Sequence, residues 1–456
     1  MTSGVGVRIE PIPVPHVKTS MQSSSLIPCI ALLALPSFAL AQAPYFPAPV
    51  AGSTWETTDH ATLGWCPERI DSLYAYLGDH HTKGFILLKD GRIVLEHYFG
   101  TFTQDSLWYW ASAGKTLTST IVGIAQEDGS LDINEPVSTY LGPGWTAETP
   151  TQEAAITVRH QLTMTTGLDD GVANSDCTDP ACLAYIADAG DRWAYHNAPY
   201  TLLQEVVANA TGQNYYTYFN ARLRDPIGME GFWLPILYNR VYFSTVRSMA
   251  RFGLLASNGM VWGTDTILHD SAYFHAAITP SQNLNHSYGY LWWLNGQDSF
   301  MLPSSQFVFP GELVPHAPAD MYSALGKNDQ IINVAPGQGL VLVRMGDPAY
   351  DAQLVSSVFD DHVWQYVNAL DCNTGIDEVG LQQGPVLAPN PCKDVVRFQL
   401  PNKVRSAEVT LFDTMGRTVL TTRSTGTIDV SMLAPGSYAV RIISDGKTWT
   451  SALKKE

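Results

Sequence analysis

Two groups of short apolar runs enclose a long stretch with helical patterning. In the first group, residues 84–88 and 93–95 flank Asp90-Gly91, a dipeptide typical of a tight hairpin turn. In the second group, near 330–344, two further runs of apolar β-branched residues read as strands. Between the groups, apolar residues recur mainly at helical spacing, with Gly and Pro stops. Strands at both ends of a helical middle predict one sheet with a helical insertion, an α+β plan.

Both ends of the chain differ from this body. Residues 26–41 are almost all apolar and end in Ala39-Leu40-Ala41, a small-x-small cleavage pattern. We expect residues 1–41 to be a signal peptide, with Met21 as a possible start; a buried helix is the other interpretation. The run is too short for a comfortable membrane span.

The C-terminal part carries the opposite charge to the body. Residues 375–388 lack periodicity and are predicted to be a linker, and 389–456 contain short β runs with turns, typical of a small all-β module. This module has a net charge of +4, whereas residues 42–388 have −22. Such a body repels nucleic acid and anionic surfaces, so we expect no nucleic-acid partner.

The cysteines indicate disulfides rather than a metal site. Cys177 and Cys182 are five residues apart in a loop rich in Asp and Pro, and we expect them to pair in an exported chain. Removal of the signal peptide leaves five cysteines, so at least one stays unpaired. No cysteine has metal-ligand spacing with histidine, so the sequence predicts neither a metal nor a cofactor.

The segment around Ser112 carries a candidate nucleophile. Ser112 and Lys115 stand at or near the start of a predicted helix that ends at Asp128-Gly129. Positions i and i+3 share a helix face, so a neutral Lys115 can take the proton of the Ser112 hydroxyl. By itself this spacing also fits a helix with an ordinary surface lysine.

Two further segments complete a possible site. Tyr195 and Asn197 precede a predicted helix: a tyrosine beside the lysine can pass its proton to a leaving group, and Asn197 can orient the lysine and the substrate carbonyl. Gly326 enters a predicted strand, where it allows close approach of substrate, and the N–H of Lys327 can join that of Ser112 as an oxyanion hole. Core packing of a Tyr-rich loop and an ordinary strand glycine are the other interpretations.

The order of these three elements resembles the serine β-lactamase-like superfamily, in the branch with class C β-lactamases, esterases and 6-aminohexanoate-dimer hydrolases. The sequences of segments 156–168, 244–254 and 288–293 are similar to that branch as well, and the resemblance covers roughly residues 65–370. It implies an antiparallel sheet flanked by helices with a helical insertion, over a domain at 44–374. It also implies that the first and last helices pack together, which suggests Cys66 and Cys372 as a second disulfide.

This chain departs from the family's third motif, which is often Lys-Thr-Gly or has His for Lys. Here the motif is Ala324-Leu325-Gly326, and Lys327 starts on the wrong face of the strand to replace the missing cation. Binding of a penicillin-type carboxylate is thereby weakened. We expect a hydrolase that cleaves an ester or linear amide of a small molecule or short peptide through an acyl-Ser112 intermediate, rather than a β-lactamase. A non-catalytic surface or ligand-binding protein is the alternative.

The tail at 389–456 resembles the C-terminal sorting domain of proteins exported by type IX secretion, on residues 389–391, 411–417 and 433–438. The resemblance implies a β-sandwich that serves as a sorting signal and is recognised by that secretion machinery. It also implies delivery to the surface or exterior of a Gram-negative bacterium. A β-sandwich that binds carbohydrate is the other interpretation.

Overall fold

The computed structural model describes residues 44–350, 355–372, 387–398, 406–414, 416–444 and 447–456. The expected signal peptide at 1–41 and most of the expected linker at 375–388 lie outside these residues, so both stay predictions. The described residues up to 372 gather around one hydrophobic core, and those from 387 onward gather around a second, smaller one.

A six-stranded sheet forms the centre of the larger part, and every neighbouring pair of its strands is antiparallel. The strands in spatial order are β2 (Arg92–Tyr98), β1 (Thr82–Lys89), β13 (Leu340–Gly346), β12 (Gln330–Ala335), β11 (Tyr322–Gly326) and β8 (Trp293–Leu294). The expected hairpin joins β1 and β2, and its turn residues Asp90 and Gly91 both have positive φ, 48° and 82°. The antiparallel sheet of the expected fold class is confirmed.

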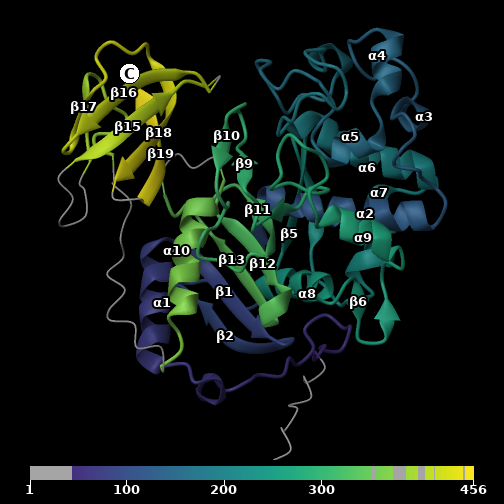
Figure 1. Ribbon diagram of the computed structural model, residues 1–456. Helices are drawn as coiled ribbons and strands as arrows, with labels where there is room; N and C mark the ends of the chain where they lie inside the picture. Colours follow the sequence, from purple (N-terminus) through teal and green to yellow (C-terminus); the bar gives the residue numbers. More distant parts are fainter. Residues whose placement is uncertain (1–43, 351–354, 373–386, 399–405, 415, 445–446) are drawn as a thin grey trace, which may run out of the picture. The chain divides into compact units, whose positions relative to one another are not determined.

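Helices cover both faces of this sheet (Figure 1). On α8 (Val246–Ser257), Gly253 lies so close to the sheet that an added Cβ would be 2.6 Å from Val341 of β13. Three residues along the same strand, the Arg344 guanidinium stacks 5.0 Å from the ring of Phe359 on α10 (Ser357–Asn368). Because successive side chains of a strand point to opposite faces, α8 and α10 cover opposite sides. The strands of such a doubly covered sheet read as continuous apolar runs.

The first and last helices pack together, as the resemblance implied: α1 (Pro67–Asp79) lies beside α10 (Figure 1). The disulfide between Cys66 and Cys372 joins the residue before α1 to the end of the described segment that follows α10. The second expected disulfide, between Cys177 and Cys182, is also formed, and Cys392 is a free, buried cysteine.

Two helices form the centre of the helical part. All residues of α2 (Lys115–Glu127) from 115 to 125 are buried, so this helix is surrounded by protein on every side, and α6 (Asn197–Thr211) packs against it. The other helices here are α3 (Ser138–Leu141), α4 (Pro150–Ala155), α5 (Val158–Leu162), α7 (Tyr215–Phe219) and α9 (Ser271–Ala277).

The middle of the chain also contains short strands that helical spacing did not predict. A three-stranded sheet has the order β3 (Trp108–Tyr109), β5 (Asn239–Ser244) and β4 (Phe232–Ile236). Two small hairpins consist of β6 (Val261–Trp262) with β7 (Asp265–Thr266), and β9 (Ser299–Met301) with β10 (Val308–Pro310). Strands of two to six residues are too short to show a clear alternation in sequence.

The C-terminal part is all-β in its described residues, as expected. One sheet has four strands, β16 (Thr418–Ser424), β15 (Ala407–Phe412), β18 (Gly436–Ser444) and β19 (Lys447–Lys455); a second pairs β14 (Val395–Arg397) with β17 (Thr427–Asp429). Inward-facing Val409, Leu411, Val440 and Ile442 are almost fully buried. No helix in the described part of the chain is long and apolar enough to cross a membrane.

Candidate active site

The turn that carries Ser112 is fixed from its N-terminal side. The backbone N–H of Trp110 donates to the carbonyl of Tyr242 (2.8 Å), and its indole N–H donates to the Ser244 hydroxyl (2.7 Å). Ala111 then takes a positive φ of 47°, an uncommon conformation for a residue with a Cβ. Ser112 follows in a 3₁₀ turn, Ala111–Gly114, that leads directly into α2. Ser112 therefore lies one turn before the α-helix rather than within it.

Lys115 is buried and faces the serine. Its side-chain Nζ donates to Ser112 Oγ at 3.1 Å and to Asn197 Oδ1 at 2.8 Å. The same Nζ lies 5.0 Å from the centre of the Tyr195 ring and 4.2 Å from that of Tyr200. Burial lowers the pKa of Lys115 from 10.5 to about 7, and the negative charge of Asp176 opposes this shift. Burial therefore shifts this amine toward its neutral form, compared with an ordinary lysine.

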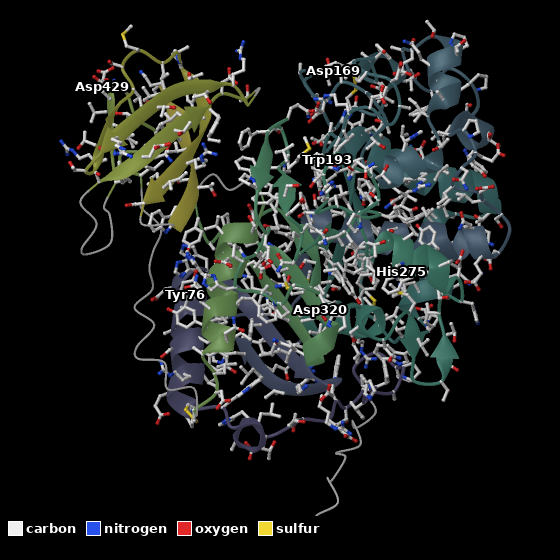
Figure 2. All side chains as sticks on the ribbon, viewed as in Figure 1. Tyr76, Asp169, Trp193, His275, Asp320 and Asp429 are labelled. Atoms are coloured by element: carbon white, nitrogen blue, oxygen red, sulfur yellow. A yellow bond between two sulfur atoms is a disulfide. The ribbon has the colours of Figure 1, made fainter. Side chains whose placement is uncertain are left out.

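Tyr195 lies in the loop before α6, within an aromatic group. Its ring stacks on Trp293 (5.8 Å between ring centres), and both rings contact Tyr288 and Trp193. Figure 2 labels Trp193 of this group. Burial raises the pKa of Tyr195, and a hydrogen bond with the Ser112 side chain acts in the opposite direction. The phenol therefore stays neutral near pH 7, and it sits close enough to Ser112 to exchange a proton with it.

His196, between Tyr195 and Asn197, is buried and takes no part in this network. Its ring nitrogens have no hydrogen-bond partner within the described residues, and burial lowers the pKa of its imidazole. The residue stands at the N-cap of α6 but makes no side-chain cap hydrogen bond. The imidazole therefore packs in the interior and does not cap the helix.

Gly326 lies against the turn that carries Ser112. An added Cβ at this position would be 2.3 Å from the carbonyl oxygen of Trp110 and 2.9 Å from the backbone nitrogen of Ala113, so only glycine fits. The end of β11 and the Ser112 turn are thus in direct backbone contact, and the oxyanion hole stays a prediction. The side chain of Lys327 is exposed, whereas Ala324, which the resemblance matches to the family's cation, is buried.

The structure brings Ser112, Lys115, Tyr195, Asn197 and Gly326 together, as the sequence predicted. Their catalytic roles remain proposals. Two residues that sequence reasoning missed join them: Asp176 accepts hydrogen bonds from the side-chain amides of Asn197 (2.8 Å) and Asn239 (3.0 Å). The position of Asp176 next to a paired cysteine was the only signal for it, and Asn239 gave none.

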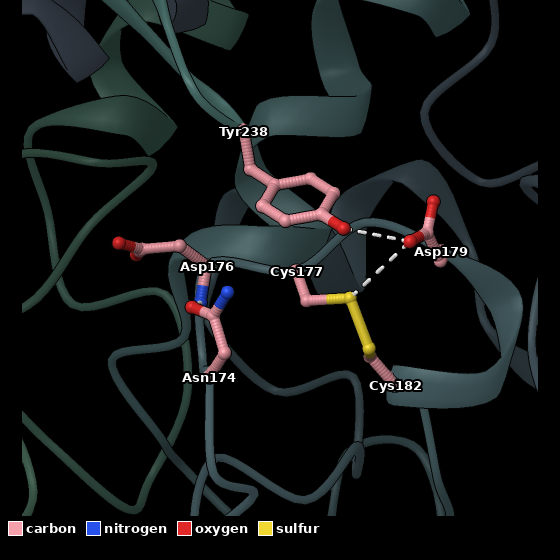
Figure 3. Close-up of a disulfide and its surroundings, with 6 residues drawn as sticks. All are labelled: Asn174, Asp176, Cys177, Asp179, Cys182 and Tyr238. Carbon is pink, nitrogen blue, oxygen red and sulfur yellow. Dashed lines mark hydrogen bonds between the residues drawn. A yellow bond between two sulfur atoms is a disulfide. The ribbon is translucent and has the colours of Figure 1, made fainter.

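A disulfide closes the loop that carries Asp176 (Figure 3). Cys177 follows Asp176 directly and pairs with Cys182, and the Tyr238 hydroxyl donates to Asp179 within the loop at 2.7 Å. Among the described residues, no group of three or more His, Cys, Asp or Glu is placed to hold a metal ion.

Two family models match this chain. Residues 71–346 match the beta-lactamase model, and residues 386–456 match the model of a secretion system C-terminal sorting domain. Penicillin-binding protein 4* of Bacillus subtilis (strain 168) is 26% identical over 189 residues, which are 36% of this chain and 40% of that protein. The D-alanyl-D-alanine-carboxypeptidase/endopeptidase AmpH of Escherichia coli (strain K12) is 28% identical over 141 residues, 28% of this chain and 36% of that protein. Both alignments thus span less than half of the relative's length.

Solved structures show the same fold. A protein described as a 6-aminohexanoate-dimer hydrolase from Bacillus anthracis superposes with a TM-score of 0.54 at 18% identity, over 72% of this chain and 89% of that one. A penicillin-binding protein homologue from Caulobacter crescentus has a TM-score of 0.52 at 13% identity, over 67% and 98%. The beta-lactamase model covers more than half of the residues, and its range contains every residue of the site described above. The chain therefore belongs to the beta-lactamase family and ends in a secretion system C-terminal sorting domain.

Proposed function

We propose that this protein is a secreted serine hydrolase that cleaves an ester or a linear amide through an acyl-Ser112 intermediate. The observation that carries the proposal is the buried Lys115 amine, 3.1 Å from Ser112 Oγ, with a pKa lowered to about 7. A lysine at its ordinary pKa is protonated at neutral pH and cannot accept a proton. Burial thus makes this lysine a base suited to activate a hydroxyl.

Each neighbour has a role in the proposed reaction. Neutral Lys115 takes the proton of Ser112 as Oγ bonds to the substrate carbonyl carbon, whose oxygen becomes the oxyanion. The N–H groups of Ser112 and Lys327 would stabilise that oxyanion. The Tyr195 hydroxyl then relays the proton to the leaving group as the carbon–leaving-group bond breaks. In the second half of the reaction, Tyr195 and Lys115 take a proton from water as its oxygen bonds to the acyl carbon. The bond from that carbon to Ser112 Oγ breaks, Oγ regains a proton, and the acid is released.

The charges near the site favour a substrate without a carboxylate. Ala324 occupies the position where the family often has a lysine or histidine, and the side chain of Lys327 is exposed. The half-buried carboxylate of Asp176 adds negative charge beside Asn197. A penicillin or D-Ala-D-Ala peptide presents its own carboxylate and would lack a cationic partner here. A neutral ester or linear amide has no carboxylate and needs no cationic partner in the site.

A hydrolysis screen tests this function. Purified protein is assayed on p-nitrophenyl esters of short acids, short linear amides, a chromogenic cephalosporin and D-Ala-D-Ala peptides. We expect turnover of esters or linear amides that exceeds turnover of the β-lactam. No turnover in any class, with binding of one of them, would favour the alternative of a non-catalytic ligand-binding protein on this scaffold.

Substrate charge should change the rate in a salt-dependent way. At low salt we expect kcat/KM for a neutral p-nitrophenyl ester to exceed that for a matched ester with a terminal carboxylate, because the body has a net charge of −22. Added salt screens this repulsion and should raise kcat/KM for the anionic ester only. Faster turnover of the anionic ester at low salt would contradict the expectation.

The C-terminal module should serve delivery rather than catalysis. The site residues named above all precede it in the chain, and residues 386–456 match a sorting domain. Deletion of 389–456 should leave kcat/KM of the purified enzyme nearly unchanged, while in the native host the truncated enzyme stays in the periplasm. If the truncated protein is still exported but loses activity on a polymeric substrate, the module binds substrate and the sorting role is wrong.

A further inference from the structure

The carboxylate of Asp176 is linked to the proposed base through one side chain. Its Oδ1 accepts from Asn197 Nδ2 at 2.8 Å, and Asn197 Oδ1 accepts in turn from Lys115 Nζ at 2.8 Å. The other carboxylate oxygen, Oδ2, accepts from Asn239 Nδ2 at 3.0 Å. The result is a continuous chain of hydrogen bonds from β5 through Asp176 and Asn197 to Lys115 and Ser112.

The acceptor-only character of a carboxylate decides how Asn197 is oriented. An asparagine amide has one donor end and one acceptor end, and these ends can exchange places by a half-turn of the side chain. Asp176 can only accept, so the NH₂ of Asn197 must face it and the amide oxygen must face Lys115. In the opposite orientation the NH₂ of Asn197 would face the Lys115 amine. The amine would then lose the amide oxygen that accepts its N–H hydrogen bond.

The loop around Asp176 is held by covalent and hydrogen-bonded ties. Cys177, the next residue, is tied to Cys182 by a disulfide (Figure 3). On the other side, the carbonyl of Ser175 accepts from the backbone N–H of Ala198 at 3.3 Å, which joins the loop to the first turn of α6. These ties hold Asp176 at a fixed place relative to Asn197.

We propose that Asp176 is a positioning residue of this site, which fixes the amide of Asn197 so that its oxygen orients Lys115 toward Ser112. This role rests on the proposed function. This role explains why the half-buried carboxylate of Asp176 lies in the site with two side-chain amides as its hydrogen-bond donors. The Cys177–Cys182 disulfide would then contribute to the site only by holding this one neighbouring side chain in place.

The charge of Asp176 predicts the direction of a pH effect. The groups facing Lys115 are the Ser112 hydroxyl, the Asn197 amide and the rings of Tyr195 and Tyr200; burial raises the pKa of both phenols, so they stay neutral. Asp176 is the charged group that acts on the lysine, and it raises the lysine pKa. Without this charge the amine should lose its proton at lower pH.

The experiment measures the rate of labelling by a fluorophosphonate probe between pH 5 and 9, on the full protein with its disulfides intact. Labelling requires neutral Lys115, so the rate rises with pH through the lysine pKa. In Asp176→Asn we expect the midpoint of this rise to move down by about 1 pH unit. The labelling rate reached at high pH should also be lower, because the side-chain amide of Asn197 can then rotate by a half-turn. Asp176→Glu keeps the charge, so its midpoint should stay at the wild-type pH while its plateau falls.

Asp179→Asn is the matched control, because Asp179 lies in the same loop but bonds to Tyr238. Its profile should overlay that of the wild type. A pH profile of Asp176→Asn that overlays the wild-type profile, or moves to higher pH, would overturn the proposal. If Asp176→Asn does not fold, a shifted midpoint in Asp176→Glu would overturn it instead. A wild type that is not labelled at all would instead overturn the proposed function, and with it this role.

Discussion

Replacement of Ser112 by alanine is expected to reduce kcat by about 10⁴-fold or more, because it removes the atom that would bond to the substrate. Lys115→Ala should cost nearly as much, since Lys115 Nζ, 3.1 Å from Ser112 Oγ, is the proposed base. Residues that act as one unit give losses that do not add. The double variant should therefore be little slower than either single variant.

Ser119→Ala is the matched control for this series. Ser119 is a buried serine on α2, two turns after Ser112, and its hydroxyl has no hydrogen-bond partner within the described residues. Its loss should leave both folding and kcat near wild type. Substantial turnover by Ser112→Ala, with Ser119→Ala unchanged, would show that another group is the nucleophile. Losses that multiply in the Ser112/Lys115 double variant would show that the two residues act independently.

Tyr195→Phe is expected to lower kcat by roughly 10²- to 10³-fold and to change KM little, because a proton relay acts mainly in the transition state. The ring and its contacts with Trp293 and Tyr288 remain in this variant, so only the hydroxyl next to Ser112 is lost. Steady-state kinetics on the best substrate of the screen separate kcat from KM.

Tyr200→Phe supplies the comparison for Tyr195→Phe. The Tyr200 ring also faces Lys115, at 4.2 Å, but its hydroxyl lies near Thr118 (3.4 Å). Loss of this hydroxyl should therefore have a small effect on kcat. A rise in KM with unchanged kcat in Tyr195→Phe would make Tyr195 a binding residue, and equal losses in both variants would point to a general effect of the aromatic group.

The parts of the fold that depend on local pattern could be predicted from the sequence. Asp90-Gly91 marks a hairpin because its conformation needs positive φ, and the apolar runs at 84–88 and 330–344 became strands of one buried sheet. Pro67 at the start of α1 is a local signal of another kind, because the fixed φ of proline suits the first helical turn.

The candidate site was predictable where spacing fixes geometry. Ser112 and Lys115 are three positions apart and meet at 3.1 Å. Bringing Tyr195, Asn197 and Gly326 to the same place required the family resemblance, because contacts between residues 80 or more positions apart leave no trace in local periodicity.

Long-range pairing explains what sequence reasoning missed. The strand β3 before Ser112 pairs with β5, and Asn239 at the start of β5 reaches the loop of Asp176. Neither contact follows from periodicity, since each joins segments more than 60 residues apart. The 3₁₀ turn that holds Ser112 was also missed, because apolar spacing does not separate the last turn before a helix from the helix itself.

The most direct test of the central claim is to locate the covalent adduct. The full-length protein is treated with a fluorophosphonate, digested, and analysed by peptide mass spectrometry alongside Ser112→Ala and Ser119→Ala. The account predicts one adduct per chain, on Ser112, present in Ser119→Ala and absent from Ser112→Ala. An adduct on another residue, or labelling that persists in Ser112→Ala, would contradict it.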